Sequence, residues 1–170
     1  MKGFTHLDER GRARMVDVTE KKVSLREATA RGAVLMRSET FRMIVTGGME
    51  KGDVLGVAKV AGIMGAKRTA ELIPMCHPLS ITGVEIIFHP IEEKHQIEIE
   101  ARVKLKGQTG AEMEALVAVA MAALTIYDMC KAVDREMVIS DICLVEKKGG
   151  KSGHFVRSKN SPRKDTGSHR

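Results

Sequence analysis

Asp128 and Lys131 place an acid and an amine together inside an otherwise apolar stretch near the end of a helical pattern. Residues three apart are neighbours on a helix surface, so both groups can face one site. Burial and a close opposite charge are two influences that move a pKa toward catalytic use. A partly exposed ion pair, worth ~0.3–0.5 kcal/mol, explains this segment equally well by itself. This segment alone therefore fits a catalytic pair and an ordinary surface ion pair equally well.

A second candidate is the loop around Met75, Cys76 and His77, which is bracketed by Pro74 and Pro78. The prolines keep the three residues out of helices and sheet ladders and hold their side chains in fixed directions. A binding site needs such rigidity. Zinc sites need three or four ligands at workable spacing, and the other two cysteines stand singly in apolar runs. A substrate-contacting loop is therefore favoured over a metal site.

Five segments, in order, resemble the cyclic pyranopterin monophosphate synthases, which are the molybdenum cofactor biosynthesis protein C family. They are KRTAELIP, LIPMCHPL, KGQTGAEMEAL, ALTIYDMCKAVD and KKGGKSG, and the resemblance runs from about residue 15 to about residue 153. It implies a lyase that rearranges (8S)-3′,8-cyclo-7,8-dihydroguanosine 5′-triphosphate into cyclic pyranopterin monophosphate and releases pyrophosphate. It also implies a ferredoxin-like α+β fold and a hexamer, a trimer of dimers, with interfacial active sites.

Two lysines are candidate anion ligands. Lys51 follows a Gly-Gly pair and precedes Asp53, just ahead of an expected helix, where a lysine beside free backbone N–H groups suits a phosphate. A solvated loop lysine is the competing interpretation, and the resemblance favours a substrate-contacting, catalytic role. Lys147 opens a glycine-rich run that fails the Walker pattern but can wrap an anion, although a solvated hinge explains it equally well. The resemblance again favours a ligand.

Further substrate contacts come from one arginine and from the start of a long expected helix. Arg26 is a candidate triphosphate contact with weaker support. Glu112 and Glu114 are favoured near a helix N-terminus by its dipole alone. The resemblance adds that Met113 and Glu114 contact substrate, with Glu114 accepting from N–H groups of the guanine-derived ring.

The implied reaction needs proton transfer and stabilisation of phosphate charge. We assign Asp128 and Lys131 as the general acid/base pair, with Lys51 and His77 moving protons or holding phosphate. No metal ligand set and no cofactor is assigned, and Mg²⁺ could assist at the phosphates without a dedicated site.

Composition limits the remaining possibilities. The 170 residues, 43% hydrophobic and 29% charged, suit one soluble domain. Three cysteines without a framework fit a reducing cytoplasm, and neither a signal peptide nor an uncharged run of membrane-helix length is visible. From Lys147 onward there are eight basic residues and one acid, so this part has a net charge of +7. The rest of the chain has a net charge of −1, which gives the total of +6. A near-neutral body with 3% aromatic residues argues against nucleic-acid binding.

The elements that must position these groups follow from periodicity. The sequence predicts strands at residues 15–18, 24–36, 81–90, 96–106 and 137–146, and helices at 38–45, from 53 to before Pro74, and 111–133. A capping-box pattern at residues 24–27 competes with the strand there. This order gives an antiparallel sheet with helices packed on one face. Residues 1–14 are expected to be a mobile segment, 15–157 the catalytic domain and 158–170 a disordered basic tail.

Two rival functions remain: a ligand-sensing domain of the same fold, and an RNA-binding module that uses the basic tail. The first leaves the Asp128/Lys131 pair unexplained. Helix arithmetic adds one more expectation. Glu114 and Asp128 share a helix face but lie roughly 21 Å apart along its axis, so one reacting centre cannot touch both. We therefore expect a homo-oligomer in which Glu114 of one chain meets Asp128 of a neighbour.

Overall fold

The computed structural model describes residues 10–12, 14–151 and 153–158. Four long strands form one antiparallel sheet with a short fifth strand at its edge, in the order β2-β3-β1-β4-β5. The strands are β1 Ser24–Leu35, β2 Ile81–Ile91, β3 Gln96–Gly107, β4 Val138–Lys148 and β5 Phe155–Val156. Strand, helix, strand, strand, helix, strand with β1 in the centre is the ferredoxin-like arrangement, which confirms the predicted fold class.

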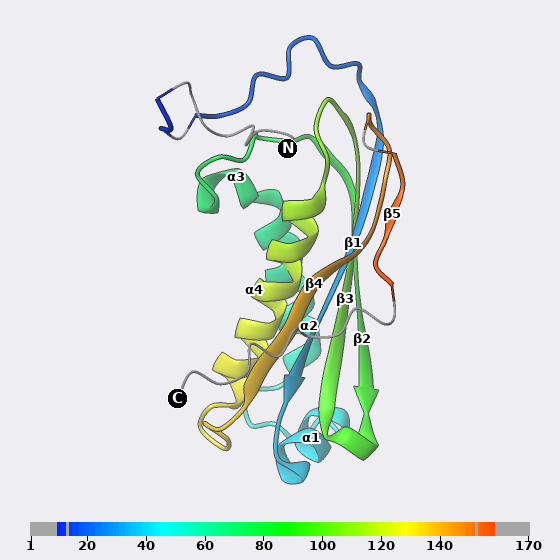
Figure 1. Cartoon of the computed structure of the whole chain (residues 1–170). Coiled ribbons are helices and arrows are strands. Elements are labelled where there is room, and N and C mark those ends of the chain that lie inside the picture. The colour runs from blue at the N-terminus through cyan, green and yellow to red at the C-terminus, as the bar shows by residue number, and fades with distance from the viewer. Residues whose placement is uncertain (1–9, 13, 152, 159–170) are drawn as a thin grey trace, which may run out of the picture.

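The helices cover one face of this sheet (Figure 1). They are α1 Ser38–Val45, α2 Val54–Lys67, α3 Thr69–Leu72 and α4 Glu112–Cys130, and a single 3₁₀ turn, Glu92–Lys94, joins β2 to β3. Between the sheet and α4 lies an aliphatic core. Its fully buried side chains include Val34, Ile97, Ile99, Val103, Leu105, Val119 and Ile126.

The apolar helix α4 is long enough to cross a membrane by length and composition. More than half of its apolar stretch is buried within the protein, which is how the core helix of a globular domain looks. Close packing of α2 against it depends on Gly62, where an added Cβ would lie 2.9 Å from the Ala118 carbonyl oxygen. Gly65 also faces α4, since an added Cβ there would lie 2.6 Å from Cγ of Met121.

Most predicted elements are confirmed within a few residues. Residues 24–35 form a strand and not a helix, since β1 is hydrogen-bonded on both sides, by β3 and β4. The predicted edge strand at residues 15–18 is wrong. That segment forms no strand and does not pair with the sheet, and Val16 and Val18 instead line a cavity beside α4. The long helix after Asp53 stops at Lys67, and β5 was not predicted.

Candidate functional site

The three residues predicted to be catalytic lie together at the C-terminal end of α4, which we call the Asp128 end. The Lys131 amine lies 2.7 Å from Oδ1 of Asp128, and the Lys51 amine donates to the Asp128 carbonyl oxygen at 3.1 Å. The Lys131 ammonium, followed by that of Lys51, holds the pKa of the Asp128 carboxyl below its usual range. Both members of the pair are more than half exposed, so their functional groups are open to a ligand.

Lys51 reaches this end because of the chain around it. After α1 the chain turns at Gly47, which has φ +73°, and Met49 is buried in the core. Asp53 then caps α2 by accepting a hydrogen bond from Gly56 N at 2.8 Å. The sequence placed the Lys51 amine at the entrance of α2. The structure turns it instead toward the C-terminal turn of α4, where carbonyl groups and the helix dipole attract a cation.

The opposite end of α4, the Glu114 end, is built from buried groups. Glu114 is only 3% exposed, and burial raises the pKa of its carboxyl to about 7. The loop after α3 borders the same cavity as Glu114. Burial, followed by the Glu114 charge, raises the pKa of the Cys76 thiol in this loop. A carboxyl group with a pKa near neutrality can accept or donate a hydrogen bond, depending on what binds beside it.

A cavity of about 350 Å³ joins these groups to the N-terminal segment. The loop after α3 forms one wall, the start of α4 another, and the chain around residues 16–21 the third. Its lining includes all three loop residues and all three helix residues predicted to bind substrate: Met75, Cys76, His77, Glu112, Met113 and Glu114. The sequence therefore identified residues that the fold brings together from segments about 35 positions apart.

Next to this cavity lies a larger open hollow of about 1050 Å³ with basic walls. Arg26 is nearly buried, and its guanidinium donates to the carbonyl oxygens of Gly107 and Gln108. Lys147 lies 3.8 Å from a carboxylate oxygen of Glu112, which borders both spaces. This hollow has the size and charge to take a polyphosphate.

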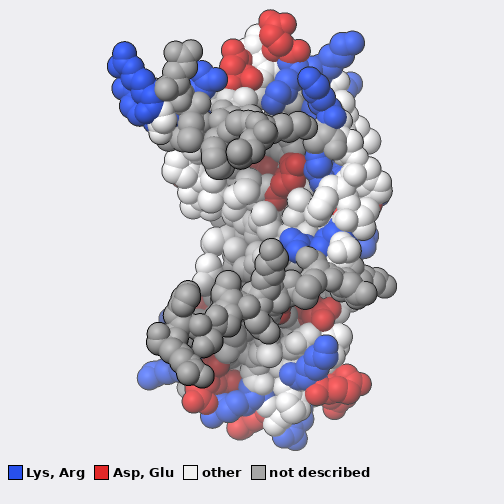
Figure 2. Space-filling view, viewed as in Figure 1, with Lys and Arg blue, Asp and Glu red and all other residues white. Residues whose placement is uncertain are grey.

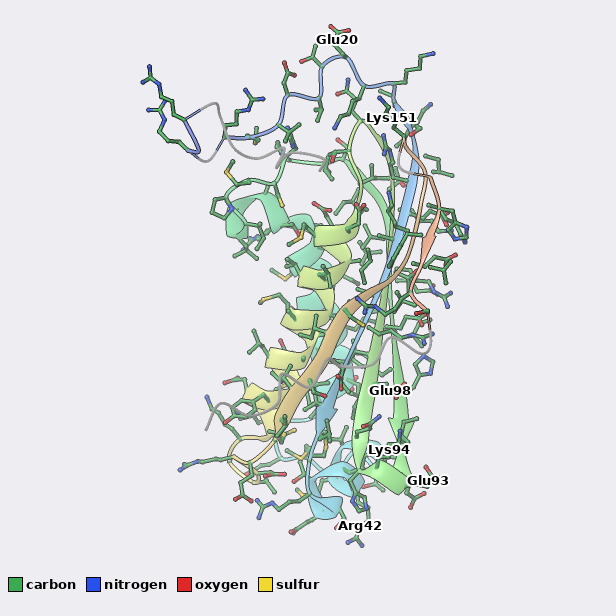
Figure 3. The ribbon with its side chains drawn as sticks, in the orientation of Figure 1. Glu20, Arg42, Glu93, Lys94, Glu98 and Lys151 are labelled. Atoms are coloured by element: carbon green, nitrogen blue, oxygen red, sulfur yellow. The ribbon has the colours of Figure 1, made fainter. Side chains whose placement is uncertain are left out.

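Three further lysines line the hollow, namely Lys21, Lys22 and Lys151. The sequence analysis missed Lys21 and Lys22, and it included Lys151 only as part of the glycine-rich run expected to wrap an anion. The signal was present as a pair of adjacent lysines and a third in the glycine-rich run, but nothing in the sequence placed them beside Arg26. Figure 3 labels Lys151 and Glu20 at the end of the molecule where the N-terminal segment crosses. Lys and Arg side chains gather there with a few acids among them (Figure 2).

The two ends of α4 are separate in one chain. Glu114 and Asp128 both belong to one continuous helix, so they stay roughly 21 Å apart along its axis. Their predicted common face is only approximate, because Glu114 turns into the protein while Asp128 is exposed. Each chain thus presents two separate sets of polar groups.

No three His, Cys, Asp or Glu side chains come together as a metal ligand set among the described residues. Cys130 and Cys143, like Cys76, are free thiols. The carboxyl and ammonium groups at the Asp128 end can transfer protons, and the lysines and Arg26 of the hollow can bind anions.

Comparison with known proteins shows the family of the chain. Residues 15–150 match the model of the MoaC family. A cyclic pyranopterin monophosphate synthase from Pelotomaculum thermopropionicum is 63% identical over 157 residues, which cover 92% of each chain. Proteins of the same name from Heliobacterium modesticaldum and Desulfitobacterium hafniense are 62% and 63% identical, over 92% and 91% of this chain and 99% and 94% of theirs. The family match covers both ends of α4, the loop after α3 and the lining of the basic hollow except Lys151. Together with the relatives it confirms the resemblance drawn from the motifs: the chain belongs to the MoaC family.

Proposed function

We propose that this protein is a lyase of molybdenum cofactor biosynthesis, which converts (8S)-3′,8-cyclo-7,8-dihydroguanosine 5′-triphosphate into cyclic pyranopterin monophosphate and pyrophosphate. The observation that carries the proposal is the meeting of Asp128, Lys131 and Lys51 at one end of α4. The relatives named for this product, at about 60% identity over nine-tenths of the chain, support it.

The exposed pair supplies the proton transfers. Asp128 has a lowered pKa and is ionised at neutral pH, so it can accept a proton. Closing the cyclic phosphate requires a hydroxyl oxygen to attack the α-phosphorus while the bond to the β-phosphate bridging oxygen breaks. In this proposal Asp128 takes the proton of the attacking hydroxyl, and Lys131 donates a proton to the ring as it rearranges. Lys51, held against the Asp128 backbone, adds positive charge beside the phosphates.

The Glu114 end binds the rest of the substrate. Glu114 faces the guanine-derived ring, whose adjacent N–H groups are donors that match an ionised carboxylate. Met75, Cys76, His77, Glu112 and Met113 shape the cavity around it. Arg26 and Lys147, with the three further lysines, hold the triphosphate in the basic hollow. This chemistry needs no resident cofactor, and any Mg²⁺ would enter bound to the substrate phosphates.

A complete site requires two chains, so we propose a homo-oligomer, a hexamer built from three dimers. In a two-fold dimer, antiparallel α4 helices would bring the Glu114 end of one chain to the Asp128 end of its partner. Apolar side chains are exposed between the two ends and can form such a contact: Val57, Val60 and Met64 on α2, and Leu124 on α4. Sedimentation of the purified protein tests the assembly.

The decisive experiment is turnover of the authentic cyclised GTP by purified protein, with pyrophosphate and the pterin product measured separately. Release of both at equal rates is expected. Tight binding without turnover would favour a ligand-sensing domain, and binding of polynucleotides that weakens steeply with salt would favour an RNA-binding module.

A further inference from the structure

One buried carboxylate at the Asp128 end is not used by the proposed reaction. Asp134 lies four residues beyond the end of α4 and is fully buried. Its Oδ2 accepts hydrogen bonds from Arg37 N at 2.9 Å and from the Thr40 hydroxyl at 3.2 Å, and its Oδ1 accepts from Glu136 N at 3.1 Å. These donors come from both sides of the contact between the α4 turn and α1, so the carboxylate links the two segments.

Arg37 completes the same link from the other side. Its Nε lies 3.2 Å from Oδ1 of Asp134, and its Nη2 donates to the Val133 carbonyl oxygen. Arg37 is also the N-cap residue of α1 and makes no capping bond with its own side chain. Asp134 therefore provides the acceptor that the first turn of α1 lacks, at the positive end of the helix dipole.

Both linked segments lead directly to candidate catalytic groups. The turn that contains Asp134 begins at Lys131, whose N–H is bonded to the Tyr127 carbonyl, and the N–H of Asp134 is bonded to the Cys130 carbonyl. On the other side, α1 leads through buried Met49 to Lys51. Figure 1 shows α1 and the C-terminal end of α4 at the same end of the molecule, where Figure 3 labels Arg42 of α1.

Cys130 lies between these groups. It is fully buried, and burial raises the pKa of its thiol to about 11, an effect that the Lys51 ammonium opposes and the Asp134 charge increases. Lys51 and Asp134 thus act on the same buried atom from their two segments.

We propose that Asp134 is a positioning residue: through Arg37 and the first turn of α1, its carboxylate fixes the spacing between Lys51 and the Asp128/Lys131 pair. This inference rests on the proposed function, since spacing matters only if these three groups act on one substrate. Misplacement of a reacting group by about 1 Å can lower a rate by 10²-fold even when the change lies away from the chemistry.

The test is Asp134→Asn, which keeps the shape but turns an amide N–H₂ toward N–H donors. We expect kcat to fall by about 10- to 100-fold while KM changes less than about threefold, because the groups at the Glu114 end are untouched. Hydrogen exchange of the same variant should accelerate in residues 131–136 and 46–52 and stay unchanged in β3.

Two further variants serve as matched tests. Thr40→Val removes one hydroxyl donor from a fully buried site and should lower kcat by a few-fold with KM unchanged. Glu100→Gln changes another buried carboxylate that is held by two arginines, Arg31 and Arg102, on the sheet away from this turn. It should leave kcat within about twofold.

Three results would overturn the inference: unchanged exchange in Asp134→Asn, accelerated exchange with unchanged kcat, or equal losses in Asp134→Asn and Glu100→Gln that follow the folded fraction. If Asp134→Asn does not fold, Thr40→Val decides in the same way. Absence of turnover in the unmodified protein would instead reject the proposed function, and the exchange data would still decide whether Asp134 holds the two segments together.

Discussion

The two ends of α4 carry carboxyl groups in opposite environments. Glu114 is buried, and its pKa is raised to about 7; Asp128 is exposed beside two ammonium groups, and its pKa is lowered. The same helix thus holds one carboxyl poised to change protonation at neutral pH and one that stays ionised. When two environments separate the pKa values of like groups in this way, the groups are suited to different tasks. We assign recognition to the Glu114 end and proton transfer to the Asp128 end.

The largest effect is expected from removing the groups that transfer protons. Asp128→Asn and Lys131→Ala should each lower turnover by about 10²–10⁴-fold, the usual scale for one positioned acid or base. If the two act as one unit, the double variant should lose little more than either single variant. Measured kcat values for the three proteins decide this. Losses that multiply would assign the two residues separate, structural roles.

The next largest effect is expected from mixing two inactive variants. It tests whether the Glu114 end of one chain meets the Asp128 end of its partner. An inactive Asp128→Asn chain and an inactive Glu114→Ala chain, exchanged in solution, form hybrid dimers with one intact composite site. Random exchange should restore about a quarter of the activity of the unmodified protein. Two differently tagged chains, co-purified after mixing, establish that exchange occurred. An exchanged mixture without activity would place the whole site in one chain.

A smaller effect is expected in the pH dependence of the free energy of unfolding, to which Glu114 and Asp128 contribute with opposite signs. The folded-state pKa of Glu114, about 7, lies above its ordinary value of 4.5, so its contribution to stability is complete below pH 4.5 and is lost as pH rises through 7. The loss is about 3 kcal/mol, from 1.36 kcal/mol per pKa unit. Urea unfolding at pH 5 and pH 8 should show this decline, and Glu114→Gln should remove it.

Asp128 provides the contrast for the same measurement. Its lowered pKa stabilises the folded protein above its ordinary value of 3.8, and this contribution is lost as pH falls below that value. Asp128→Asn should therefore leave the decline between pH 5 and pH 8 unchanged. A Glu114→Gln variant that altered stability equally at pH 5 and pH 8, or an Asp128→Asn variant that changed the decline between them, would contradict the assigned difference in environment.

The smallest effect is expected outside both ends. Deleting residues 158–170 should change neither the melting temperature nor kcat, since the segment contains no apolar residue that could pack. Calorimetry and the turnover assay measure both quantities. A melting temperature lowered by several degrees would show that the tail binds the folded domain. Apart from Ser158, these residues lie outside the described part of the chain, as do residues 1–9, and their predicted mobility and disorder stay predictions.

Local patterns predicted the strands and helices because periodicity records which face is buried. The alternation in residues 96–106 identified β3 almost to the residue, and the stop at Gly47-Gly48 identified the end of α1. Residues 15–18 alternate too, yet they form no strand. A strand needs a partner, and an alternation of four residues does not show whether a sheet edge is free to receive it.

The sequence by itself determined the family, the order of elements, the Asp128/Lys131 pair three residues apart on a helix, and the distance between the two ends of that helix. These follow from spacing within one segment. Only the tertiary structure decided that Lys51 joins the Asp128 end, that Lys21, Lys22 and Lys151 line the hollow beside Arg26, and that burial raises the pKa of Glu114. Each of these depends on packing between segments far apart in the chain, and burial and proximity across such distances leave no local pattern in the residues that experience them.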